Sequence, residues 1–193
     1  MIEKYLNWLE SHQIKIDKEK IEKLNSFSKL VFEWNRKINL TAARNEKEIV
    51  TRHILDSLMP LKIGADREKE LLDLGSGGGF PAIPLAIMLD KTKFLLVEKV
   101  AKKCAFLNKA KRELELKNIF VENTMFEQLQ SPLPKALITR AVRIDKKLLN
   151  EMKKKKIVHY YAFLSEKPEN IPHYGYILPD EKKERYVARK EAE

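Results

Sequence analysis

The chain has 193 residues, of which 44% are hydrophobic and 34% charged. This composition can bury a core and excludes a disordered protein, while the length excludes two full domains. Lysine and arginine outnumber aspartate and glutamate by 38 to 28, a net charge of +10 that favours a polyanionic partner such as nucleic acid or an anionic membrane surface. A well-solvated surface would explain the same excess.

The cysteine content and the N-terminal residues indicate the compartment. Cys104 is the one cysteine, so the chain cannot form an intramolecular disulfide, which suits a reducing environment. Residues 1–5 lack the basic-then-apolar pattern of a signal peptide, and the longest apolar stretch, residues 80–89, is too short for a membrane span. We therefore expect a cytoplasmic protein that does not bind membranes.

The first 63 residues have helical periodicity. Asp17 is placed to cap a helix, and the apolar residues that keep helical spacing after it are Ile21, Leu24, Val31 and Trp34. A second helix is expected over residues 46–59, and its buried stripe would be Ile49, Val50, Ile54 and Leu58. We expect residues 1–63 to form an N-terminal helical cap.

From Glu70 onward, strand patterns alternate with helix patterns. Strands are expected at residues 70–74, 93–98, 118–122, 135–140 and 157–164. Helices are expected at residues 81–89, 100–116 and 145–153, with a short helical turn at 125–129. This alternation predicts a parallel sheet covered on both faces.

Residues 174–178 and 185–189 are strand-like, and the short link between them leaves no room for a helix. They are expected to form an antiparallel hairpin. An α/β, Rossmann-like sheet that ends in such a hairpin is typical of class I S-adenosylmethionine-dependent methyltransferases. We assign residues 64–193 to this domain.

The loop after the first predicted strand carries the main functional signal. It reads Asp-Leu-Gly-Ser-Gly-Gly-Gly-Phe-Pro over residues 73–81, and ligands bind at this end of such strands. Glycines let the backbone approach a ligand closely. A dinucleotide-binding loop would need its third glycine at position 80, where the chain has Phe80, and the extra glycine falls at Gly79 instead. This is the spacing of an S-adenosylmethionine loop, in which Asp73 could orient the loop or the ligand's ammonium group.

Glu98 ends the second predicted strand, the position from which an acid binds ribose hydroxyls. The alternative interpretations are that Glu98 is an exposed acid at a strand end and that the glycine loop is a structural turn that binds no ligand.

The sequence also bears on the methyl acceptor. Residues 138–142 lack the Asn/Asp-Pro-Pro-aromatic motif of enzymes that methylate amino groups of bases, and Cys104 lies on a predicted helix, where it would pack rather than act as a nucleophile. A ring nitrogen such as guanine N7 needs neither that motif nor a cysteine nucleophile, because it has a free lone pair. Alignment alone can contribute about 7–11 kcal/mol to such a reaction.

Two segments are strongly basic. The first comprises Lys99, Lys102, Lys103, Lys109, Lys111 and Arg112, and the second Arg140, Arg143, Lys146, Lys147 and Lys153 to Lys156. Either segment could be the solvated face of a helix. Alternatively, the two segments together could form a track for RNA phosphates beside the ligand site.

Four motifs together resemble one family. They are residues 34–41 (Trp-Asn-Arg-Lys-Ile-Asn-Leu-Thr), residues 52–57 (Arg-His-Ile-Leu-Asp-Ser), the glycine loop through Leu85, and Thr139-Arg140-Ala141. In this order they resemble the GidB/RsmG family of bacterial 16S ribosomal RNA guanine-N7 methyltransferases, over residues 24–141. The resemblance implies S-adenosylmethionine as cofactor and the small ribosomal subunit, with a target guanine in the 530 loop, as partner. We further expect a monomer without a metal.

The loop pattern and the resemblance together imply the site. The residues expected to bind the cofactor are Asp73, Gly75, Ser76, Gly77, Gly79, Phe80, Glu98, Phe126, Glu127 and Arg140. Phe126 and Glu127 would lie along the adenine, with Arg140 at the mouth. Candidates for guanine recognition are Asn35, Asn39, His53, Asp56 and Ser57, and those expected to act in catalysis are Arg140, His53, Asp56 and Asn39. His53, Asp56 and Ser57 would share one helix face, although a polar contact between cap and sheet would explain the same trio.

The chain departs from the family pattern at three places. Glu98 replaces an aspartate, Met125 replaces an arginine, and residues 162–165 (Ala-Phe-Leu-Ser) lack the family's lysine. Three other functions remain open: a class I methyltransferase of a small molecule or protein, an RNA-binding assembly factor without catalysis, and NAD binding, which Phe80 disfavours.

Overall fold

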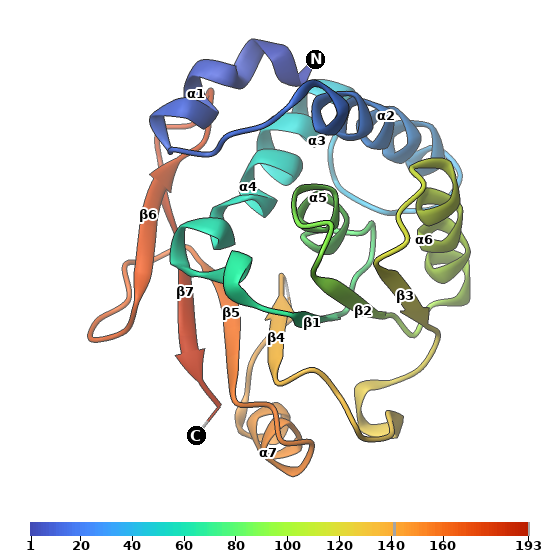
Figure 1. Ribbon diagram of the computed structural model, residues 1–193, viewed down its shortest axis with the longest axis vertical. Helices are drawn as coiled ribbons and strands as arrows, with labels where there is room; N and C mark the ends of the chain where they lie inside the picture. Colours follow the sequence, from blue (N-terminus) through green and yellow to red (C-terminus); the bar gives the residue numbers. More distant parts are fainter. Residues whose placement is uncertain (141, 193) are drawn as a thin grey trace.

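The computed structural model describes residues 1–140 and 142–192 (Figure 1). Ala141, the last residue of the Thr-Arg-Ala motif, lies outside the described residues, as does Glu193. The strands form one sheet of order β3-β2-β1-β4-β5-β7-β6. Their bounds are β1 Glu70–Leu74, β2 Lys93–Val97, β3 Ile119–Glu122, β4 Ala136–Thr139, β5 His159–Leu164, β6 His173–Ile177 and β7 Glu184–Glu191.

The pairing confirms the predicted parallel sheet and its terminal hairpin. Strands β1 to β5 pair in parallel, whereas β7 runs antiparallel to both β5 and β6. Central β1 lies between β2 and β4, so the carboxyl ends of these three strands open at the same edge. The glycine loop leaves β1 at that edge, where ligands of open α/β sheets bind.

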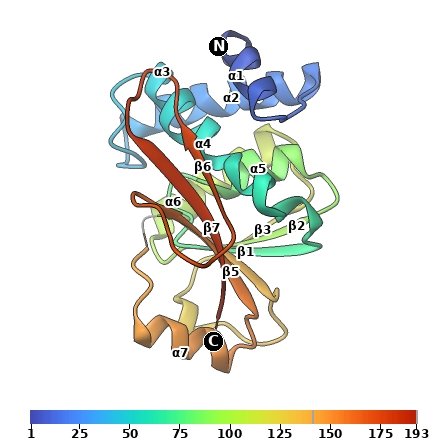
Figure 2. The same cartoon turned by 90° about the vertical axis from the view of Figure 1, so that its left-hand side faces the viewer.

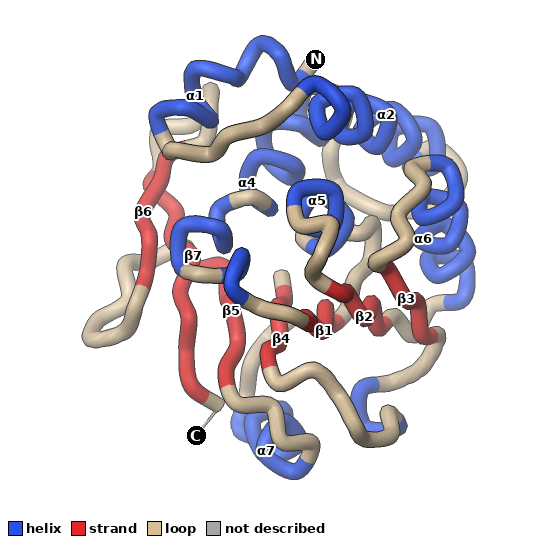
Figure 3. The backbone as a smooth tube through the Cα atoms, viewed as in Figure 1, coloured by secondary structure: helices blue, strands red, loops and turns tan. Residues whose placement is uncertain are grey.

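Helices cover both faces of the sheet. On one face lie α2 (Lys18–Asn35), α5 (Ala82–Met88) and α6 (Ala101–Glu113), while α7 (Lys146–Lys154) lies on the opposite face (Figures 2 and 3). The cap of α2 is as predicted, because Asp17 Oδ1 accepts a hydrogen bond of 2.9 Å from the Lys20 amide. A short 3₁₀ turn at Phe126–Gln128 matches the helical turn expected there.

The predicted helix over residues 46–59 is divided. The structure has α3 (Glu46–Ile49), a π-helical segment (Val50–Ile54) and α4 (Leu55–Ser57) in its place. All four residues of its predicted stripe are fully buried. The π turn widens the helix locally, as such turns often do at functional sites, and periodicity alone cannot reveal it.

The remaining N-terminal elements are α1 (Leu6–Ser11) and 3₁₀ turns at Ile2–Tyr5, Met59–Ile63 and Ala65–Arg67. Their apolar side chains join one hydrophobic cluster that includes Phe27 and Ile54 of the helices and Phe94 and Ile138 of the sheet. The boundary at residue 63 stays a prediction. Across the described ranges, no helix has both the length and the apolar character that crossing a membrane requires.

Asn118 holds the α5–β2 connection against the start of β3. Its Nδ2 lies 3.1, 3.0 and 3.1 Å from the carbonyl oxygens of Ala86, Leu89 and Thr92. We predict that Asn118→Ala lowers the free energy of unfolding by about 1–3 kcal/mol, because partly buried carbonyls lose their donor. Urea unfolding would measure this, with the exposed Lys117→Ala as control. Equal stabilities of the two variants would contradict the prediction.

Candidate active site

The glycine loop takes a backbone path that favours glycine. Gly75, Gly77 and Gly79 have φ values of +74°, +54° and +83°. A Cβ atom at Gly79 would lie 2.5 Å from Ile83 Cδ1, and one at Gly75 would lie 2.8 Å from Val142 Cγ2. Glycine is thus required at Gly75 and Gly79 for both conformation and space.

Glu98, directly after β2, fastens this loop. Its Oε2 accepts a hydrogen bond of 2.9 Å from the Gly77 amide, and its Oε1 accepts one of 2.8 Å from the Val100 amide. The Gly75 and Ser76 amides donate to the Val97 carbonyl at 2.9 and 3.2 Å. Glu98 is buried, so the alternative of an exposed acid at a strand end is wrong. Ribose binding by Glu98 stays a prediction, since its loop contacts leave each carboxylate oxygen with a further lone pair.

Asp73 lies inside the protein beneath the loop. Its side chain is fully buried, and within the described residues neither carboxylate oxygen has a hydrogen-bond partner. Burial raises its pKa from 3.8 to about 7, and the nearby Glu98 carboxylate adds to the rise. Within the described ranges, Asp73 belongs to the lining of neither of the two cavities below, so its pairing with a ligand ammonium stays a prediction.

A first cavity of about 480 Å³ opens at the ends of β1 and β2. Leu74, Gly75, Val97 and Glu98 form its floor. Phe126 and Glu127 line one wall and α7 lines another, with Leu148 among its contributions. The structure thus brings both residues expected beside the adenine to the glycine loop. The volume lies in the range of small-molecule sites.

A second cavity of about 280 Å³ adjoins the first, and Gly75 and Lys103 line both. The second cavity lies between the loop and the N-terminal helices. Its lining is completed by Leu40, Thr41, Ala42, His53, Ser76, Gly77, Gly78, Phe80 and Arg140. The two cavities are therefore neighbours at the glycine loop.

Arg140, the residue after β4, joins the sheet to the N-terminal helices. Its Nη2 donates to His53 Nδ1 at 2.7 Å and to the Arg52 carbonyl at 3.0 Å. Its Nε lies 3.3 Å from Asp56 Oδ2. These contacts bring together three of the four residues predicted to act in catalysis, and they hold the guanidinium at the second cavity.

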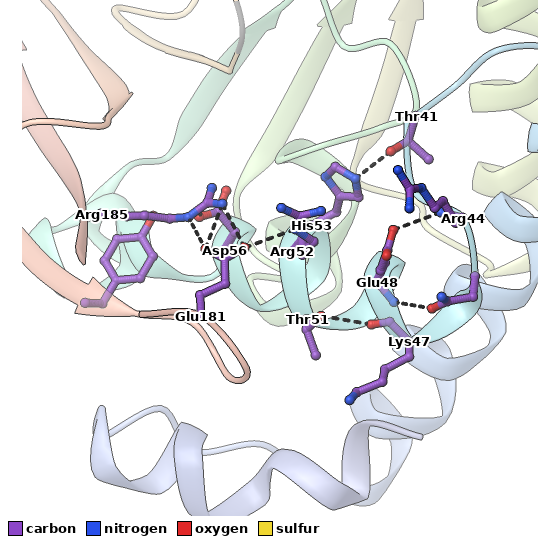
Figure 4. A network of polar contacts seen from close by, with 12 residues as sticks. Thr41, Arg44, Lys47, Glu48, Thr51, Arg52, His53, Asp56, Glu181 and Arg185 are labelled. Atoms are coloured by element: carbon purple, nitrogen blue, oxygen red, sulfur yellow. Dashed lines mark hydrogen bonds and ion pairs between the residues drawn. The ribbon is translucent and has the colours of Figure 1, made fainter. Parts of the chain in front are cut away.

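His53 is neutral, with its tautomer set by Arg140. Burial, followed by the positive charges of Arg140, Arg52 and Arg185, lowers its pKa to about 3. Because a guanidinium only donates, Nδ1 must accept, and the ring proton lies on Nε2. Nε2 faces Thr41 Oγ1 at 2.5 Å (Figure 4). The ring stacks on Phe80 with 5.0 Å between centroids.

Asp56 is buried among groups that compensate its charge. Its Oδ1 accepts a hydrogen bond of 2.7 Å from Tyr176 Oη and lies 3.8 Å from Arg185 Nη1 (Figure 4). Arg185 also pairs with Glu181, which in turn contacts Arg52 of the π-helical segment. Sequence reasoning missed Tyr176 and Arg185, because a polar residue in a terminal hairpin does not reveal its partner in a helix 120 residues away.

Three candidates for guanine recognition lie elsewhere. Ser57 Oγ donates to the His53 carbonyl at 2.6 Å, so its hydroxyl points to the backbone. Asn35 Oδ1 accepts from the amides of Leu40 and Thr41, at 2.9 Å each, and shapes that loop. Asn39 is exposed, and in the described part of the chain it belongs to the lining of neither cavity. A role of these three side chains in catalysis or recognition stays a prediction.

Comparison with known proteins identifies the family. The GidB family, described as rRNA small subunit methyltransferase G, matches residues 20–170. A ribosomal RNA small subunit methyltransferase G of Wolinella succinogenes is 34% identical, over 93% of this chain and 94% of that protein. The chain belongs to this family. A namesake from Stutzerimonas stutzeri is 42% identical, and that match spans 61% of this chain and about half, 54%, of the relative.

Solved structures confirm the predicted fold class. A putative O-methyltransferase from Klebsiella pneumoniae aligns with a TM-score of 0.57 at 12% identity, over 94% of each chain. TYW2 of M. jannaschii in complex with AdoMet aligns with a TM-score of 0.52 at 13% identity, over 78% of this chain and 77% of that one. At these identities the likeness concerns the fold.

We predict that Gly77→Asp abolishes binding of S-adenosylmethionine, the cofactor expected from the sequence. The new carboxylate would occupy ligand space and face Glu98, which binds the same amide. Gly77→Ala is the control, because a Cβ there meets only the Gly75 carbonyl oxygen, at 3.7 Å. Calorimetry should find no binding to the aspartate variant and measurable binding to the alanine variant; unchanged affinity of Gly77→Asp would exclude the role of the loop.

Asp73 generates a second prediction. If its carboxylate pairs with the cofactor's ammonium, binding favours the ionised form, and affinity should rise as the pH increases from 5.5 to 7. In the free protein, stability changes with pH in the opposite direction. Because burial raises the Asp73 pKa from 3.8 to about 7, the free energy of unfolding falls as the pH rises through that range. Asp73→Asn should flatten both profiles. Calorimetry at several pH values measures the first, and a pH-independent affinity of the unaltered protein would refute the pairing.

Proposed function

We propose that this chain transfers a methyl group from S-adenosylmethionine to N7 of a guanine in the 530 loop of 16S ribosomal RNA. The strongest support is that the cavity at the glycine loop adjoins a second cavity, which Arg140 and His53 line. Family membership supports the class of substrate, because the relatives are named small-subunit ribosomal RNA methyltransferases. We propose a cytoplasmic monomer.

The first cavity suits the adenosine part of the cofactor. Phe126 offers an aromatic wall for the adenine, and Glu98 has carboxylate lone pairs within reach of the cavity for the ribose. The glycine loop exposes backbone at Gly75, and Asp73 would hold the ammonium. When bound, S-adenosylmethionine supplies an electrophilic methyl group on a sulfonium. The chain's contribution is to orient this methyl toward the second cavity.

The second cavity suits an acceptor that has no proton to lose. His53 Nδ1 already accepts from Arg140, and its Nε2 proton is directed to Thr41. Lys103 and Arg140 present donors to the same space. Guanine N7 attacks with a lone pair and requires no base, so alignment and shielding from water suffice. The lining therefore favours N7 over an exocyclic amino group.

Arg140 would position the target base at the mouth of this cavity. Its Nε and Nη2 are fixed by Asp56, His53 and the Arg52 carbonyl, while Nη1 is buried with no partner among the described residues. The two N–H groups of Nη1 thus have no acceptor among the described residues, and the proposed contact with a substrate atom requires that they become accessible when the substrate binds. Asp56 and His53 act by holding the guanidinium, and Asn39 is proposed to contact RNA from the exposed rim.

The decisive experiment is methyl transfer from labelled S-adenosylmethionine to small ribosomal subunits that lack the modification, followed by identification of the product nucleoside. We expect 7-methylguanosine in the 530 loop. Label in another nucleoside or another region would overturn the assignment of the target. Cofactor binding without any labelling of RNA would overturn the substrate class and leave the cofactor site intact.

We predict that Arg140→Ala lowers kcat/KM at least about 100-fold, roughly 2.7 kcal/mol of transition-state stabilisation. The fold should persist, because Asp56 keeps its contacts with Tyr176 and Arg185. Circular dichroism and thermal melting would verify folding, and Arg67→Ala, at an exposed residue that lines neither cavity of the described chain, is the matched control. Turnover of Arg140→Ala at the unaltered rate would rule out this role.

A further inference from the structure

The four lysines of residues 153–156 do not all face solvent in the same way. Lys153, Lys154 and Lys156 are exposed, and the Lys154 side chain is 72% exposed and pairs with Glu151 of its own helix. Lys155 is half-buried. Its Nζ donates hydrogen bonds to the backbone carbonyls of Glu127 and Leu129, at 3.1 and 2.8 Å.

These two carbonyls belong to the 3₁₀ turn Phe126–Gln128 and to the residue that follows it. Carbonyls at the end of a helical turn have no partner within the turn and need a donor from elsewhere. The Lys155 ammonium supplies it, with charge-assisted hydrogen bonds. The same ammonium lies 5.6 Å from the centroid of the Phe126 ring, within the range of a cation–π interaction.

The contacts matter because they join two walls of the first cavity. Phe126 and Glu127 line one wall, and residues Asp145, Lys147, Leu148 and Glu151, on α7 or at its cap, line the facing wall. Lys155 is the C-cap residue of α7. A second link, between Lys147 and Glu127 at 3.8 Å, joins two largely exposed side chains and contributes little.

We propose that Lys155 is a positioning residue for the cofactor site, which fixes the Phe126 turn against α7 and so sets the width of the adenosine cavity. The proposal rests on the proposed function, since it takes the ligand of this cavity to be S-adenosylmethionine. It separates Lys155 from the phosphate track suggested by the sequence. The three exposed lysines of the run remain candidates for that track.

The test compares Lys155→Met with Lys153→Met, at an exposed residue of the same helix, in the full chain. Methionine keeps much of the aliphatic stem and removes the ammonium. Calorimetry with S-adenosylmethionine and with S-adenosylhomocysteine, in the absence of RNA, should show a dissociation constant roughly tenfold higher for Lys155→Met, as expected for loss of hydrogen bonds from a charged group. Lys153→Met should bind the cofactor as the unaltered protein does. Lys155→Arg should restore binding, because a guanidinium can donate to both carbonyls.

Steady-state kinetics provide a readout that a general loss of stability would not reproduce. We expect Lys155→Met to raise the KM for S-adenosylmethionine, with kcat at saturating cofactor and the KM for RNA unchanged. An unchanged cofactor affinity, or a rise in the KM for RNA alone, would overturn the proposal. If Lys155→Met folds poorly, failure of Lys155→Arg to bind the cofactor while folded would also overturn it. Absence of cofactor binding by the unaltered protein would instead refute the proposed function.

Discussion

The site depends on a backbone turn that passes through left-handed conformations at three glycines directly after a buried strand. Such a turn exposes amide groups that must be paired, and the Glu98 carboxylate and the Val97 carbonyl pair them. The loop is therefore held to β2 before any ligand arrives. A rigid loop of this kind costs little ordering entropy on binding, which favours affinity through preorganisation.

The two buried aspartates of the site, Asp56 and Asp73, differ in the partners that surround their carboxylates. Asp56 has Arg140, Arg185 and Tyr176 as partners and is compensated within the protein. Asp73 has no hydrogen-bond partner among the described residues, although it is equally buried. Burial of a carboxylate without a partner costs several kcal/mol or a shifted pKa, and a cationic ligand can offset that cost. The charge of Asp56 is thus compensated within the protein, whereas among the described residues that of Asp73 is not.

The sequence predicts most of the fold, because alternation of strand and helix patterns is a local property. The strands, the Asp17 cap, the glycine loop and the hairpin follow from residues close together in the chain. The site is predicted in part, since the meeting of Arg140 with His53 joins residues 87 positions apart. The π turn at Val50–Ile54 and the inward direction of Lys155 could not be read from periodicity or charge, because both depend on tertiary contacts.

The hydrophobic cluster above the sheet contains residues from both ends of the chain. Ile2 and Leu9 belong to it together with Leu178 and Val187, and Trp8 Nε1 donates to the Ile177 carbonyl at 2.9 Å. The apolar side chains of α1 and the turn before it are therefore fully covered only when the β6–β7 hairpin has also been synthesised. Contacts between distant parts of a chain also slow folding, because they close long loops. The cover of the N-terminal helices is thus supplied by a segment that is synthesised after them.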